Sequence, residues 1–283
     1  MPPLNVSVMQ TIAKVTFIAN MINLPIEWQQ PGKQYPGAFK PGEKSVATVP
    51  LAPPYIFKWV STNKYHIDTV KAIGQKFSDF IDKACGAIGF AVDMWKIQAH
   101  FQNIQVMAVC AMGGPGCLTG PGLGSFIKTS PQLAASTGQE AKYRNAVADA
   151  FDKKWKAWQD KVMVPGLPWY PAFAAFPGPM APPMPNVPVP LIACPSAGMA
   201  ELTPISLKSA MVDALGESDA LHHKELFEGI ATGFSAAFLQ WLPTQMVMLV
   251  MGKGPVPTFA PPFVPVGPVI GGDVIPAPGH LMT

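Results

Sequence analysis

Charged side chains are scarce in this chain. They make up 13% of its 283 residues, against roughly 25% in typical soluble domains. Hydrophobic residues make up 49%, and the mean hydropathy is +0.23. This combination excludes an intrinsically disordered chain, which is rich in charge and poor in apolar residues. Because an isolated monomer with so few charges would be poorly soluble, we expect the chain to bury surface against partner chains.

The chain also lacks a large excess of positive or negative charge. The formal net charge is only +3, and the lysines and arginines are scattered along the chain. Lys142 and Arg144 are the one arginine-led pair on a predicted helix face. A nucleic-acid-binding surface needs a denser basic stripe than this. We therefore expect no nucleic-acid partner.

The four cysteines, Cys85, Cys110, Cys117 and Cys194, have no zinc-like spacing. Cys110 and Cys117 lie seven positions apart, not two, and no histidine pair lies nearby. We predict buried free thiols in a reducing compartment and no metal site. Residues 1–6 lack a basic region followed by an apolar core, so we expect no signal peptide.

Catalytic motifs are absent from the sequence. It contains no Gly-x-Ser-x-Gly motif and no Ser-His-Asp set in a supporting context. Residues 120–125 look like a phosphate loop but lack the Gly-Lys-Ser/Thr ending. His222 and His223 are adjacent, so on a helix they point in different directions. We expect them to form a solvated face and not a metal pair. We expect no enzyme activity and no cofactor.

Proline and glycine are abundant, with 33 and 25 residues or about a fifth of the chain, where about 12% is usual. Most of the chain therefore cannot be regular structure. Two stretches are especially rich in proline, at residues 165–195 and 254–275. We call these the first and second proline arms.

Apolar residues recur at three- and four-residue spacings in five stretches, which predicts helices there. Thr137 and Glu140 form a capping box, and Pro204 can open a first helical turn. Pro243 lies inside the last stretch and should kink or split it. The predicted fold is mainly α: amphipathic helices joined by long irregular proline- and glycine-rich arms. The five stretches are residues 8–23, 66–112, 137–162, 203–215 and 218–251.

Two of the predicted helices carry aromatic residues at matching positions. Phe151, Trp155 and Trp158 align with Phe234, Phe238 and Trp241, and each set lies on one helix face. A helix followed by an arm thus appears twice, with a fainter third copy over residues 89–115, unless amphipathic helices with proline tails look alike by chance. This pattern predicts four units. They are an N-terminal extended and short-helix region at 1–60, and helical units at 61–127, 128–199 and 200–283.

The aromatic residues of these faces and arms are the candidate interaction residues. We expect the helices to pack by their aromatic faces and the arms to reach across neighbouring subunits. Proline-rich arms lose little entropy on docking, since the free chain is already restricted. We also expect the arms to be ordered only on other polypeptides. The candidates are Phe151, Trp155, Trp158, Trp169, Tyr170, Phe234, Phe238, Trp241, Phe259 and Phe263.

The aromatic helix at Phe234–Trp241, followed by the arm at Gly254–Gly272, resembles virion structural proteins of large tailed, contractile-tail bacteriophages. The resemblance covers the last quarter of the chain. It implies a particle component, in the tail and baseplate or on the capsid, assembled in the host cytoplasm. The implied partners are other structural proteins and further copies of this chain. It implies no catalytic residues.

A membrane-associated role is the alternative. Residues 229–252 carry no charged side chain, and a span of about 20 apolar residues can cross a bilayer. Gln240, Thr244 and the central Pro243 argue against a span. So does the heavily charged matching helix at 137–162, because two copies of one unit would then face different solvents. The virion role is the preferred prediction.

Overall fold

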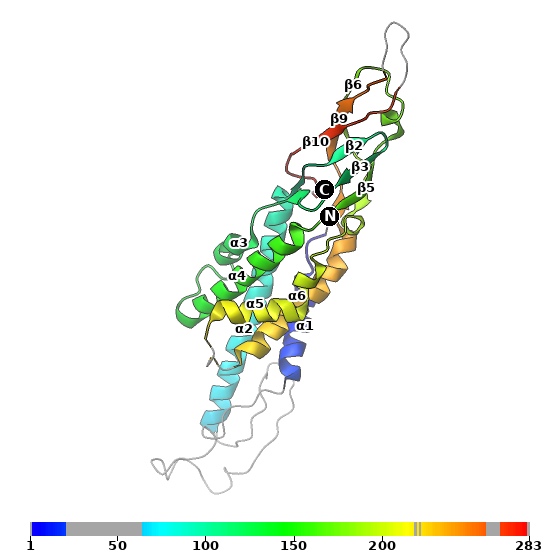
Figure 1. Ribbon diagram of the computed structural model, residues 1–283. Helices are drawn as coiled ribbons and strands as arrows, with labels where there is room; N and C mark the ends of the chain where they lie inside the picture. The colour runs from blue at the N-terminus through cyan, green and yellow to red at the C-terminus, as the bar shows by residue number, and fades with distance from the viewer. Residues whose placement is uncertain (1, 21–63, 218–219, 221, 259–266, 282–283) are drawn as a thin grey trace.

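Helices gather at one end of an elongated molecule and a sheet forms the other end (Figure 1). This computed structural model describes residues 2–20, 64–217, 220, 222–258 and 267–281. Within this part of the chain, one hydrophobic core extends from the helices into the sheet.

The helical end is built on two long helices with four others packed around them (Figure 1). Local signals set several of the ends. Asn5 Oδ1 accepts from the Val8 amide at 3.2 Å and caps the first helix. Gly216 has a φ of 66° and ends the fifth helix. The helices are α1 (Val6–Ala19), α2 (Lys64–Gln98), α3 (Leu123–Thr129), α4 (Gly138–Gln159), α5 (Pro204–Leu215) and α6 (His223–Trp241).

The sheet end has six antiparallel strands in the order β5-β3-β2-β10-β9-β6. Two two-stranded ladders, β1 with β4 and β7 with β8, lie outside it. Short 3-10 turns cover Pro171–Phe173, Leu191–Ala193, Met199–Leu202 and Leu242–Thr244. The strands are β1 (His100–Phe101), β2 (Gln105–Met107), β3 (Cys110–Gly113), β4 (Leu118–Thr119), β5 (Val164–Pro168), β6 (Met180–Pro185), β7 (Val189–Pro190), β8 (Met246–Val247), β9 (Met251–Pro255) and β10 (Gly272–Ile275).

Both edges of the six-stranded sheet are proline-rich strands. β5 reads Val-Pro-Gly-Leu-Pro and β6 reads Met-Ala-Pro-Pro-Met-Pro. Proline has no amide hydrogen to donate, so it is tolerated at a sheet edge and not in the middle. The same lack of donors discourages another strand from adding to the edge. The prolines therefore suit these two strands to the edges of the sheet. They also leave fewer backbone amides there to which another strand could bond.

The mainly-α prediction is wrong. The described residues are 52% helical and 19% strand, so the fold is mixed α/β with a six-stranded sheet. The largest error lies at 99–112, where the sequence predicts a helix and the structure has β1, β2 and β3. Asn103 and Ala108 have φ values of 54° and 52°, which a right-handed helix does not allow. Short apolar runs do not distinguish a helix from a strand by spacing alone.

The predicted helix at 218–251 is also too long. α6 ends at Trp241, and a 3-10 turn at Leu242–Thr244 follows. Pro243 lies in that turn, since its nitrogen cannot donate to a preceding carbonyl. The chain then enters β8 and β9 as extended backbone. Among the helices that the structure describes, none has the combination of length and hydropathy that a bilayer crossing requires.

The proline arms pair with each other and with the rest of the chain. β6 in the first arm is bonded to β9. β9, which leads into the second arm, is bonded to β10 within that arm. For the described residues, the expectation that these arms are ordered only on other polypeptides is therefore wrong. The sheet draws strands from three of the four predicted units, and the division into units stays a prediction.

Candidate interaction surface

The inner face of the six-stranded sheet is closed by the chain itself. Val106, Ala111 and Leu167 point inward and are at most 2% exposed. The Trp169 indole lies against this face at Gly252, where an added Cβ would come within 2.9 Å of the ring. Side chains alternate across a strand, so the residues between these buried positions point to the opposite face.

We call that opposite face the outer sheet face. The strand register orders its residues in three rows that run across the strands. One row is Pro168, Cys110, Met107, Pro255 and Met180, the second is Met112, Gln105, Asp273 and Lys253, and the third is Ile275, Met251 and Pro185.

Methionine dominates this exposed surface. Met107, Met112 and Met180 are 41%, 50% and 59% exposed, and Met251 is half-buried. An antiparallel sheet with one buried face normally places polar side chains on the other. Here the outer face carries methionine and proline together with the polar Gln105, Asp273 and Lys253. Methionine side chains are flexible and polarisable, and they are over-used on surfaces that bind other proteins.

Two opposite charges lie at the centre of the outer sheet face. Asp273 on β10 is directly opposite Lys253 on β9 in the register. Both side chains are exposed. Neither forms an ion pair within 4.0 Å to a residue that the structure describes. The face therefore offers one acid and one base, next to the polar Gln105 and between two rows of mainly apolar residues.

Six of the sequence-predicted interaction residues meet in one aromatic cluster inside the chain. They are at most 3% exposed. Phe151 meets Phe234 with ring centroids 4.8 Å apart, and Trp155 meets Phe238 at 5.7 Å. The matching faces of α4 and α6 thus pack against each other. The cluster comprises Phe151, Trp155, Trp158, Phe234, Phe238 and Trp241.

The other predicted residues lie apart from this cluster. Trp169 is 2% exposed, and its Nε1 donates to the Met184 carbonyl at 3.0 Å. Tyr170 is 44% exposed. Phe259 and Phe263 lie outside the described residues.

Sequence reasoning missed the outer sheet face because it treated 99–112 as helix. The alternation that marks these strands is visible only in the structure. In Gln105-Val-Met the buried and exposed positions alternate with period two, and the same period recurs at Met251–Pro255. The residue types alone do not show it, because neither Gln105-Val-Met nor Met251-Gly-Lys-Gly-Pro alternates apolar with polar side chains.

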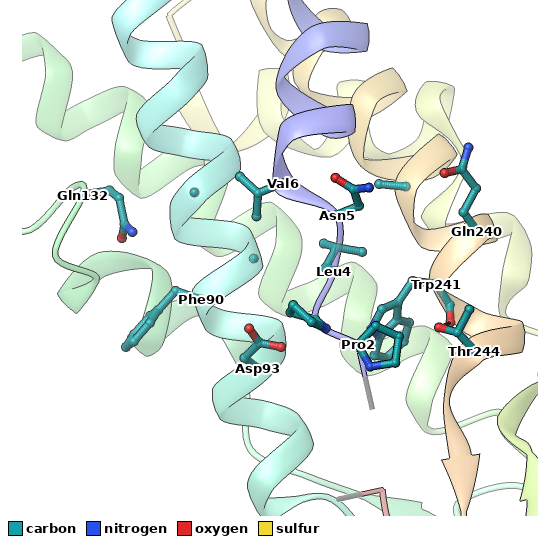
Figure 2. A pocket seen from close by; sticks show the side chains of 14 residues that line it. Pro2, Leu4, Asn5, Val6, Phe90, Asp93, Gln132, Gln240, Trp241 and Thr244 are labelled. Carbon is teal, nitrogen blue, oxygen red and sulfur yellow. Dashed lines mark hydrogen bonds between the residues drawn. The ribbon is translucent and has the colours of Figure 1, made fainter. Parts of the chain in front are cut away.

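A cavity of about 790 Å³ lies beside the N-terminal segment. Figure 2 shows this segment running between α2 and the end of α6, with Asp93 on one side and Trp241 on the other. Burial raises the pKa of the Asp93 carboxyl, and Lys96, 3.8 Å away, opposes that rise. The Trp241 Nε1 is buried without a hydrogen-bond partner among the described residues. The described lining holds no nucleophile next to a base.

The loop at 120–125 is occupied by a carboxylate. Asp152 Oδ1 accepts from the Gly124 amide at 2.8 Å. A Cβ at Gly122 would lie 2.3 Å from the same oxygen. The glycines are therefore needed for the close approach of Asp152, and a phosphate would meet its negative charge.

The histidine pair differs from its prediction. His223 is 3% exposed, its Nδ1 is hydrogen-bonded to the Ala220 carbonyl, and its ring meets Phe227 edge to face. The expectation of a solvated face is thus wrong for His223. In the part of the chain that the structure describes, no three His, Cys, Asp or Glu side chains are grouped as metal ligands would be.

The prediction of buried thiols holds for Cys85, Cys117 and Cys194 and is wrong for Cys110. Burial raises the pKa of all three buried thiols, to about 11 for Cys117 and about 12 for Cys194. Cys110 is half-exposed on the outer sheet face. The buried thiols are therefore packed side chains and not nucleophiles.

The chain matches no known protein-family model, no curated protein and no solved structure.

Proposed function

We propose that this chain is a non-catalytic structural subunit of a large protein assembly and that the outer sheet face is its docking surface. The observation that carries the proposal is the exposure of Met107, Met112 and Met180 on the outward side of a folded sheet. Large exposed apolar patches mark protein-binding sites in soluble proteins, and the three methionines share one face of this sheet. The aromatic cluster and the described arms stabilise the subunit itself.

We further propose that the assembly is the particle of a tailed bacteriophage, in its tail and baseplate or its capsid. Support for this step is the sequence resemblance over Phe234–Trp241 and Gly254–Gly272. The low charge content of the chain also suits a subunit that is soluble only in its assembly. Such a chain would be made in the host cytoplasm and would join the particle there.

The test replaces the three exposed methionines together by glutamine, as Met107→Gln, Met112→Gln and Met180→Gln. Lysates of the producing cells are separated on a density gradient, and the chain is measured in the particle and free fractions. We expect the triple variant to leave the particle fraction, because glutamine keeps the side-chain length and removes the apolar contact.

The matched control is Val15→Gln, Ile205→Gln and Leu239→Gln. These residues are 61%, 83% and 60% exposed and lie on helices away from the sheet. We expect the control to stay in the particle fraction. A methionine variant that stays there as well, or a control that leaves it equally, would overturn the assignment of docking to this face.

A further inference from the structure

The outer sheet face is complementary to a second copy of itself. We propose that two copies of the chain pair through this face about a two-fold axis, an inference that rests on the proposed function and names the partner. The axis lies between the stacked sheets and runs parallel to the strands, along the line that separates β10 from β9.

The strand order determines which residues would meet. A two-fold axis at the β10–β9 line exchanges β10 with the partner's β9, and β2 with its β6. Residues in the same row and equally far from the line then face each other. Packed sheets lie about 10 Å apart with their strands within about 30° of parallel, so side chains from both faces can meet.

The charges fit this arrangement. Asp273 and Lys253 occupy one row on either side of the line. The axis therefore places each carboxylate against the ammonium group of the other copy, and it does so twice. A two-fold interface requires such self-complementarity. Charge pairs of this kind also fix the register of an interface and exclude other alignments.

The apolar residues fit it equally well. The row that contains Asp273 also contains Gln105 on β2 and Lys253 on β9, and the next row is counted from these two residues. Two positions further along, Met107 on β2 and Pro255 on β9 share a row with Met180 on β6. Met107 and Met180 thus lie one strand beyond the central pair on opposite sides, so each faces the other across the interface.

The remaining row completes the match. Ile275 is opposite Met251 in the register, again on either side of the line. Ile275 would therefore meet Met251 of the other copy, as Met107 meets Met180 and Asp273 meets Lys253.

The edges of the sheet favour face-to-face pairing over edge-to-edge pairing. Two copies could otherwise join through free backbone groups at an outer strand. The outer strands are β5 and β6, and proline occupies two of five and three of six of their positions. Their missing amide donors disfavour a continuous sheet across two chains.

The test uses the purified full-length chain and two single charge reversals, Lys253→Asp and Asp273→Lys. Sedimentation equilibrium over a range of concentrations at low salt measures dimer formation. We expect wild type to dimerise. Each reversal should weaken the dimer by about 10-fold or more, because it changes two attractive contacts into two repulsive ones.

Mixing the two variants in equal amounts is the decisive step. One chain then carries an acid at both positions and the other carries a base at both. In a mixed dimer both contacts are attractive again, so the wild-type affinity should return. A role of these residues only within one chain predicts no rescue, since each variant keeps two like charges side by side on its own sheet.

The control reversal is Lys142→Glu, on α4 and away from the sheet. It should leave the dimer unchanged. The inference is overturned if wild type stays monomeric at every concentration, if the single reversals dimerise like wild type, or if mixing restores nothing. None of these results bears on the particle-fraction experiment with the methionine variants, so self-pairing can fail while docking to another protein at this face holds.

Discussion

The rings of Phe151 and Phe234 meet edge to face, with centroids 4.8 Å apart and ring planes at 89°. Both side chains are fully buried, one on α4 and the other on α6. Because these aromatic rings lie between the two helices, they determine how closely the helices approach each other. The pair is therefore a central contact of the helical end.

We expect Phe234→Ala to lower the free energy of unfolding by about 3–5 kcal/mol, since it leaves a cavity among rings that cannot collapse into it. In a double-mutant cycle with Phe151→Ala, the coupling should be about 0.5–1.5 kcal/mol. Urea unfolding measures both values. Tyr170→Ala is the control, because Tyr170 is 44% exposed and should change stability by less than about 0.5 kcal/mol. A coupling of zero would show that the two rings do not act as a pair.

α1 and α6 approach closely at two glycines. A Cβ at Gly233 would lie 2.4 Å from the Met9 carbonyl oxygen, and one at Gly229 would lie 2.7 Å from that of Ala13. Both obstacles are backbone atoms and cannot rotate away. We expect Gly233→Ala to destabilise the fold by about 1–3 kcal/mol, although alanine favours a helix by about 1 kcal/mol over glycine.

Gly86 in α2 is the matched control for Gly233. The three atoms nearest to a Cβ there all belong to the Gln132 side chain, the first at 3.2 Å. That side chain is flexible, so Gly86→Ala should be neutral or stabilising by up to about 1 kcal/mol. Thermal unfolding of the two variants measures the contrast. If both variants were equally stable, α1 and α6 would not be in backbone contact.

Asn186 in the first proline arm is hydrogen-bonded to Val247 and Val250, which precede the second proline arm. Its Oδ1 accepts from the Val250 amide at 3.0 Å, and its Nδ2 donates to the Val247 carbonyl at 3.0 Å. The residue is 1% exposed. Asn186→Asp replaces the donor by an acceptor that faces the carbonyl, so we expect a loss of about 2–4 kcal/mol.

Asn20 provides the control, since its Nδ2 also donates to a backbone carbonyl but the residue is exposed. Asn20→Asp should cost less than about 0.5 kcal/mol. Urea unfolding of both variants at pH 7 distinguishes a buried amide from a solvated one. Equal losses would mean that the Asn186 contacts contribute nothing beyond a surface hydrogen bond.

The helices with the clearest periodicity could be predicted from the sequence. The stretch at 137–162 is α4 at Gly138–Gln159, and that at 203–215 is α5 at Pro204–Leu215. Pro204 and Gly216 act locally at the two ends of α5, so their effect does not depend on the rest of the fold. The capping box predicted at Thr137 and Glu140 is wrong, because the Thr137 side chain forms no capping hydrogen bond. The sequence also predicts that the helices pack by their aromatic faces, and α4 and α6 meet in this way.

The sheet could not be predicted in the same way. β6 and β9 are paired across about 70 residues of chain, and glycine or proline occupies three of the five positions of β9. Such strands have low intrinsic preference for extended structure and form because their neighbours supply hydrogen bonds and packing. The residues of the outer sheet face are brought together by that non-local strand register. The face can therefore be identified only from the structure.

Cys110 should be the one thiol that reacts in the native protein. It is half-exposed, while Cys85, Cys117 and Cys194 are buried with raised pKa values. We expect iodoacetamide at pH 8 to modify one thiol per chain in dilute native protein and four after unfolding in urea. Mass spectrometry of the digested product identifies the modified residue. Rapid native modification of Cys117 would contradict its position in the core.

His280 should make stability depend on pH. Burial, with a smaller effect of His100, lowers the pKa of His280 from its ordinary 6.5 to about 4. Its Nδ1 accepts from the Phe101 amide at 2.8 Å, so protonation there removes a buried acceptor. The unfolded chain binds this proton below pH 6.5 and the folded chain only below about 4. Stability from this group is therefore present above pH 6.5 and is lost as the pH falls through that range.

A shift of this size corresponds to about 3 kcal/mol. The carboxylates of the chain titrate in the same range, so the contribution of His280 appears only as a difference between two proteins. In His280→Asn the side-chain oxygen can still accept from Phe101, and no proton is taken up. We expect the free energy of unfolding of wild type to fall by about 3 kcal/mol more than that of the variant between pH 7 and pH 4. Parallel pH curves for the two proteins would show that His280 titrates alike in the folded and unfolded chain.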